Sequence, residues 1–127
     1  MKSLDTNVIL RFLLRDVPAQ TAQAESAATS PDVYVTDVAI TETVFVLEKY
    51  YEASRSEIVS SLTAFLALPN LISNAAMFID VFELYEARAT LSIIDCYAAI
   101  EAKEWQNELV TFDKKLLKYG GAHVIEP

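Results

Sequence analysis

Five short apolar runs alternate with longer, more polar segments along the 127 residues of this chain. The runs are rich in Val, Ile, Leu, Tyr and Phe, as short strands are, whereas the segments between them are rich in the helix formers Ala, Leu, Glu and Lys. Parallel strands need a crossover connection, and a helix is the usual one. The alternation therefore predicts an α/β fold with a mainly parallel sheet that helices cover on both faces.

The pattern also places each element. Strands are expected at residues 2–4, 33–36, 71–73, 109–112 and 123–125. Helices are expected at about 6–14, 19–28, 38–51, 55–67, 76–90, 93–107 and 114–119. Ser54 and Ser92 each precede an acid by three residues, which is typical of a capping box at a helix start. The sequence contains no repeat and no linker, so one domain over residues 1–127 is expected.

Glycine and cysteine usage excludes several classes of protein. The only two glycines, Gly120 and Gly121, rule out a phosphate-binding loop of the GxGxxG or GxxxxGK type. The lone Cys96 has no partner for an internal disulfide, and the first residues do not form a signal peptide, which favours a cytoplasmic location. No apolar run approaches the ~18 residues of a membrane span, so no membrane association is expected.

Charge is unevenly distributed. The net charge is −8, which as a bulk property favours cations or a basic protein as partners over a polyanion. However, residues 1–15 and 103–118 hold seven of the ten basic side chains against four acids, whereas 16–102 holds three against thirteen. A nucleic acid would therefore approach the two basic segments.

Four carboxylates stand out by position. Asp5 and Asp113 directly follow the first and fourth expected strands, Asp95 lies in the first turn of helix 93–107, and Glu42 interrupts an apolar helix. If the first and fourth strands are neighbours, these groups converge at the carboxyl ends of the strands, where open α/β sheets bind ligands. Four such charges repel one another unless a cation lies between them, and an oxygen-only donor set suits Mg²⁺ or Mn²⁺. Singly, each also has a structural interpretation, as a helix cap, a capping-box acid or an exposed helix charge.

The sequences around these acids resemble the acidic motifs of PIN domains, in the same order and with similar spacing over the whole chain. The matching segments are Leu4-Asp5-Thr6-Asn7-Val8-Ile9-Leu10, the helix that carries Glu42, Ser92-Ile93-Ile94-Asp95-Cys96-Tyr97-Ala98, and Thr111-Phe112-Asp113. Among PIN domains, a chain of this length resembles the VapC-type toxin ribonucleases of type II toxin–antitoxin systems.

The resemblance implies an α/β/α sandwich with a central sheet of about five strands and a Mg²⁺- or Mn²⁺-dependent endoribonuclease activity. It implies metal-binding and catalytic roles for Asp5, Glu42, Asp95 and Asp113, and supporting hydrogen bonds from Thr6, Asn7 and Thr111. Arg11, Arg15, Lys114 and Lys115 are candidate contacts to RNA phosphates. Some family members carry a further acid where this chain has Lys114 and Lys115, so both one and two metal ions stay open.

The resemblance also implies a homodimer and a cognate antitoxin as partners. The third expected helix has apolar residues on more than one face, as an interface helix or a helix buried on both sides has. These residues are Val38, Val44, Phe45, Val46, Leu47, Tyr50 and Tyr51.

Other functions remain as alternatives. A PIN nuclease of RNA processing or turnover would act without an antitoxin, and a PIN-like binding module would normally lack some of the four acids. A receiver-like phosphoacceptor domain resembles the chain less well, because Ser73-Asn74 and Glu126-Pro127 stand where it needs Asp and Lys. A phosphohydrolase of the haloacid-dehalogenase kind needs a second Asp where Asn7 lies. His123, Cys96 and Trp105 are expected to have structural, packing roles.

Overall fold

A computed structural model describes all 127 residues of the chain. The chain forms two compact units, an N-terminal unit of Met1–Ala75 and a C-terminal unit of Ala76–Pro127. No helix is long and apolar enough to cross a membrane.

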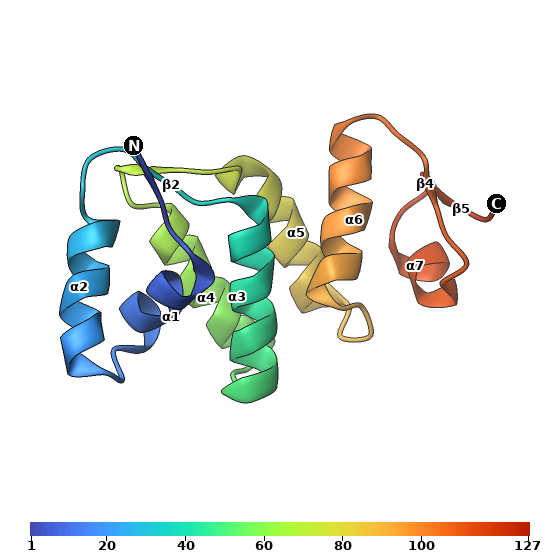
Figure 1. The fold of residues 1–127 in the computed structure, drawn as a ribbon. Helices are drawn as coiled ribbons and strands as arrows, with labels where there is room; N and C mark the ends of the chain where they lie inside the picture. The colour runs from blue at the N-terminus through green and yellow to red at the C-terminus, as the bar shows by residue number, and fades with distance from the viewer. The chain divides into compact units, whose positions relative to one another are not determined.

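The N-terminal unit is built on three short parallel strands in the order β1-β2-β3, with Lys2 of β1 opposite Val33 of β2 and Val33 opposite Leu71 of β3. Four helices connect these strands, and α1 and α2 lie side by side (Figure 1). The elements are β1 (Lys2–Ser3), α1 (Thr6–Leu14), α2 (Pro18–Ala28), β2 (Val33–Tyr34), α3 (Asp37–Tyr50), α4 (Arg55–Leu66) and β3 (Leu71–Ile72).

Local chemistry explains where these helices begin. Pro18 occupies the first position of α2, where its missing N–H costs no hydrogen bond. The hydroxyls of Thr36 and Ser54 accept the backbone N–H groups of Ala39 and Glu57 and so cap α3 and α4. The helices then bury one apolar face each, and the fully buried side chains of the unit include Ile9, Ile40, Val44, Ile58 and Leu62.

The C-terminal unit holds two helices, a parallel strand pair and a short third helix. Leu109 of β4 lies opposite Val124 of β5. The elements are α5 (Ala75–Ala87), which begins at the boundary of the units, α6 (Ile93–Glu104), β4 (Leu109–Val110), α7 (Lys114–Tyr119) and β5 (Val124–Ile125). The core is formed by Phe78, Val81, Tyr85, Leu91 and Cys96.

Gly120 and Gly121 terminate α7. A side chain at Gly120 would place its Cβ 2.6 Å from the backbone oxygen of Leu116, and Gly121 has a φ of +116°. Only glycine accepts both conditions without strain. Directly before β5, a ring nitrogen of His123 lies 2.6 Å from the carbonyl oxygen of Ala99 in α6, as expected for a structural role of this histidine.

The structure confirms the predicted α/β class and the parallel strands, and every expected helix and strand is found within a few residues of its expected position. Of the expected central sheet of about five strands, three strands pair within the N-terminal unit and two within the C-terminal unit. Each strand is only two residues long, and so short an apolar run predicts a strand without specifying its neighbours. The packing role expected for Trp105 is wrong, because its side chain is 72% exposed and does not pack in the core.

Candidate functional site

Asp5 lies where β1 ends and α1 begins. It occupies the N-cap position with extended backbone angles (φ −76°, ψ 157°), and its carbonyl oxygen accepts hydrogen bonds from Val8 and Ile9 at 3.0 and 3.2 Å. Its side chain is exposed and makes no capping hydrogen bond. The helix-cap interpretation of Asp5 therefore describes its backbone only, and the carboxylate is available to a ligand.

The carboxyl ends of all three strands of this sheet lie on one edge, because the strands are parallel. Asp5 follows β1, Asp37 follows β2 and Asn74 follows β3. The Asn74 side-chain amide donates a hydrogen bond of 3.2 Å to the Asp37 carboxylate. Sequence analysis did not select Asp37 or Asn74, although both are polar residues that directly follow expected strands.

Glu42 lies in the second turn of α3 with its side chain exposed. Its neighbours Thr41 and Thr43 are buried, and their hydroxyls donate to backbone carbonyls one turn earlier in the helix. Helices α1 and α3 pack against each other, so the residues that follow β1 and β2 lie on neighbouring elements. The N-terminal unit thus contributes Asp5 and Glu42 as two exposed carboxylates.

The basic residues of α1 are already paired. Arg11 contacts Asp16 at 2.9 Å and the Tyr51 hydroxyl at 3.0 Å, and the hydrogen bond to Tyr51 raises the pKa of its guanidinium, as does the charge of Asp16. Arg15 contacts Glu25 at 3.2 Å. An RNA phosphate would have to compete with these carboxylates for either arginine. Of the proposed supporting residues that flank Asp5, Thr6 is buried and Asn7 is exposed.

In the C-terminal unit, Asp95 belongs to a complete capping box at the start of α6. Its backbone N–H donates to the Ser92 hydroxyl at 3.1 Å, and its Oδ2 accepts the Ser92 backbone N–H at 3.2 Å. The capping-box interpretation is confirmed. It uses one carboxylate oxygen of a half-buried side chain and leaves Oδ1 for a further ligand.

Asp113 caps the short helix α7. Its Oδ1 accepts the backbone N–H groups of Lys115 and Leu116 at 2.8 and 3.2 Å, while its own N–H donates to the Thr111 hydroxyl at 3.0 Å. The side chain is exposed, and Oδ2 takes no part in the cap. Lys114 and Lys115 are exposed and form no salt bridge, unlike the two arginines of α1.

The predicted carboxylates are therefore divided, with Asp5 and Glu42 in the N-terminal unit and Asp95 and Asp113 in the C-terminal unit. No group of three or more His, Cys, Asp or Glu side chains is assembled to hold a metal ion. Each of the four acids has an oxygen free of capping bonds, and an all-oxygen donor set has the chemistry that Mg²⁺ or Mn²⁺ prefers.

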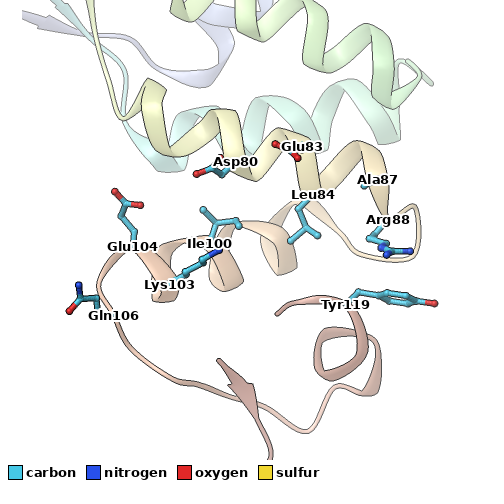
Figure 2. Close-up of a pocket in the computed structure, with 10 residues that line it drawn as sticks. All are labelled: Asp80, Glu83, Leu84, Ala87, Arg88, Ile100, Lys103, Glu104, Gln106 and Tyr119. Atoms are coloured by element: carbon cyan, nitrogen blue, oxygen red, sulfur yellow. The ribbon is translucent and has the colours of Figure 1, made fainter. Parts of the chain in front are cut away.

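A cavity of about 590 Å³ lies elsewhere, between α5 and α6, with Tyr119 of α7 at one end (Figure 2). Its acids and bases are mixed, since Asp80, Glu83 and Glu104 share it with Arg88 and Lys103. The Arg88 guanidinium lies 4.6 Å from the centre of the Tyr119 ring. None of the predicted site residues lines this cavity, and its mixed charge does not favour a metal ion or a polyphosphate.

Parallel strands joined by helices, with carboxylates directly after the strands, define an α/β protein of the class that binds its ligands at the carboxyl edge of a sheet. The chain belongs to the PIN domain family, whose model matches residues 2–122. Members of this family are generally nucleases, which are hydrolases acting on nucleic acids, and they usually use a divalent metal ion. No curated protein and no solved structure matches the chain.

Proposed function

We propose that this protein is a Mg²⁺- or Mn²⁺-dependent endoribonuclease that acts in the cytoplasm as the toxin of a type II toxin–antitoxin pair. The observation that carries the proposal is Asp5. In a chain of the PIN family, it presents an exposed carboxylate that makes no capping hydrogen bond, two residues after the end of the first strand. A helix cap that served stability alone would turn its side chain to the N–H groups of α1.

The proposal requires the two units to form one domain over residues 1–127. We propose that their strands belong to one α/β/α sandwich with a central, mainly parallel sheet of about five strands. One family model that matches residues 2–122 supports a single domain.

Asp5, Glu42, Asp95 and Asp113 would hold the metal in the assembled site. A divalent ion bound there supplies positive charge for the phosphodiester and lowers the pKa of a bound water. The chain's own residues fix the donors, since Thr111 holds the backbone of Asp113 and Ser92 holds that of Asp95. Thr6 and Asn7 would support Asp5 in the same way. Lys114 and Lys115, which have no ion pair, are the best placed basic residues to contact RNA phosphates.

The proposed partners would use the exposed surface of α3. Val44 and Leu47 are buried in the unit, whereas Val38, Phe45 and Tyr50 of α3 and its C-cap residue Tyr51 are exposed, so part of the solvent-exposed face of this helix is apolar. We propose that this face forms the homodimer. The acidic stretch 16–102 would attract a basic segment of the antitoxin toward the site.

Substitution of the proposed ligands tests the nuclease activity. Asp5→Asn and Asp95→Asn keep side-chain shape but remove one negative charge each, and we expect RNA cleavage in Mg²⁺ or Mn²⁺ to fall by more than about 100-fold. Both variants should unfold at nearly the temperature of the parent protein. Growth inhibition on expression should be lost with cleavage, and a chelator should abolish the parent's activity.

Asp32→Asn is the matched control. Asp32 is exposed just before β2, at the opposite end of that strand from Asp37, and its φ of 50° is one that Asn tolerates. The Asp32→Asn substitution removes one negative charge, as the two test variants do, but lies outside the proposed site. RNA cleavage should therefore stay within about twofold of the parent. Full activity of either Asp5→Asn or Asp95→Asn, with the control also active, would refute the metal site.

A further inference from the structure

Phe112 is the most exposed aromatic side chain of the chain, at 86%. It lies two residues after the end of β4 and directly precedes Asp113, one of the proposed metal ligands. Consecutive Cα atoms are ~3.8 Å apart, so the ring is attached next to the proposed reaction centre. An apolar ring that is exposed to water contributes little to the stability of the fold. Its position favours binding of a ligand with a flat apolar face.

The backbone on both sides of Phe112 is fixed. The N–H of Thr111 donates to the carbonyl oxygen of Ile125 at 3.0 Å, and the N–H of Asp113 donates to the Thr111 hydroxyl at 3.0 Å. The Asp113 side chain in turn caps α7 through Lys115 and Leu116. Phe112 is thus presented on an ordered segment, and little backbone entropy is lost when a ligand binds to its ring.

The charge around Phe112 favours a polyanion. Residues 109–119 contain three lysines and one aspartate. Trp105, which is 72% exposed, lies in a segment of the opposite sign, because residues 101–108 contain three glutamates and one lysine. An exposed aromatic ring among unpaired lysines is the combination with which proteins bind single-stranded nucleic acid, through base stacking and phosphate contacts.

We propose that Phe112 is a stacking platform for one base of single-stranded RNA, with Lys114 and Lys115 contacting the adjacent phosphates. The inference rests on the proposed ribonuclease function and names a further residue that binds the substrate. A base in a duplex is stacked and paired on both sides and cannot cover the ring, whereas an unpaired base can. The enzyme should therefore bind loops and single strands in preference to duplexes.

The first test is a binding measurement on the full chain with Asp95→Asn, which keeps RNA intact. We expect Phe112→Ala to weaken binding of a short single-stranded RNA by about 5- to 150-fold, and Phe112→Trp to restore it. Trp105→Ala, which removes another exposed aromatic side chain but in acidic surroundings, should bind as the parent does. In the active protein, Phe112→Ala should raise KM and leave kcat nearly unchanged.

A spectroscopic signature separates stacking from an indirect effect. With Phe112→Trp in a Trp105→Phe chain, the single tryptophan should be quenched when single-stranded RNA binds and stay unquenched with a duplex of the same sequence. Quenching by both, or by neither, would overturn the stacking platform.

The outcomes also separate this inference from the proposed function. If the parent cleaves RNA and Phe112→Ala binds and cleaves single strands equally well, only the inference fails. If Phe112→Ala leaves RNA affinity unchanged but alters the oligomeric state, Phe112 belongs to a protein contact and the inference fails. If the parent cleaves no RNA but Phe112→Ala weakens single-strand binding as expected, the stacking role stands and the ribonuclease function fails.

Discussion

Asp113 combines two roles in one side chain, since Oδ1 caps α7 and Oδ2 stays free for a ligand. Asparagine keeps the capping oxygen but not the charge, whereas alanine removes both. We expect Asp113→Ala to lower the free energy of unfolding by about 1 kcal/mol and Asp113→Asn to change it much less. Both should lose RNA cleavage to a similar extent.

Urea unfolding of the two variants, followed by circular dichroism, measures the difference in their free energies of unfolding. Cleavage assays measure the loss of RNA cleavage in each variant. Equal stability of Asp113→Ala and Asp113→Asn would contradict the capping role. Retained cleavage in Asp113→Asn would contradict the metal role while leaving the cap intact.

The unpaired lysines and the paired arginines should differ in their effect on RNA binding. Each phosphate contact to a single strand adds about 0.7 to the slope of log affinity against log salt. We expect Lys114→Ala and Lys115→Ala each to reduce that slope by about this amount. Arg15→Ala should leave it unchanged, because its charge is opposed by Glu25. A reduction with Arg15→Ala equal to that with the lysine variants would show that the arginine exchanges its partner for RNA.

For single residues, the sequence predicted contacts between neighbours in the chain and missed contacts between residues far apart in the chain. The capping box of Asp95 follows from Ser92 three residues earlier, and its geometry is as expected. The pairing of Arg11 with Tyr51 joins residues 40 positions apart, and no local pattern encodes it. The hydrogen bond from Asn74 to Asp37 is missed for the same reason, since it depends on β2 and β3 being neighbours.

Among the elements, α6 is the helix whose start matters most to the proposed site. Ser92→Ala removes the hydroxyl that accepts the Asp95 N–H, and we expect a loss of about 1 kcal/mol in unfolding free energy. The first turn of α6 should also exchange its amide hydrogens faster, because the box no longer holds it.

Ser54→Ala is the matched control, because Ser54 caps α4 through the same kind of bond to Glu57. It should lose similar stability without loss of cleavage. If Ser92→Ala also leaves cleavage at the parent's level, the capping box stabilises α6 but does not position Asp95 for the reaction.

Element positions were predictable because several helices have a start signal, such as Pro18, Ser54 and Ser92, and each strand is a short apolar run. Strand partners were not predictable in the same way. A two-residue strand such as β4 makes few backbone hydrogen bonds, and its neighbour depends on contacts distant in sequence. The sequence therefore predicted five strands and the parallel class, but not which strands pair.

For the whole molecule, the apolar part of the exposed face of α3 predicts self-association. Val38 and Tyr50 are 71% and 68% exposed on this helix. We expect the parent to be a dimer and Val38→Lys with Tyr50→Lys to be a monomer, because two buried lysines on each side would lose hydration and repel. Sedimentation equilibrium over a range of protein concentrations measures this.

Ile79→Lys provides the comparison, since Ile79 is an exposed apolar residue of α5 outside this face. It should remain a dimer. A monomeric parent would contradict α3 as the dimer interface. So would a dimer that the double variant Val38→Lys with Tyr50→Lys leaves intact.

The central claim is that Asp5, Glu42, Asp95 and Asp113 bind the same metal ion or ions. Mn²⁺ broadens the amide signals of residues close to it, so a titration followed by nuclear magnetic resonance maps its ligands in the intact chain. We predict that signals next to Asp5, Glu42, Asp95 and Asp113 broaden together at the same low Mn²⁺ concentration. We also predict that Asp95→Asn shifts the broadening at Asp5 to about 10- to 100-fold higher Mn²⁺, while Asp32→Asn does not. Broadening at Asp5 that is unchanged by Asp95→Asn would contradict a single metal site formed by these four acids.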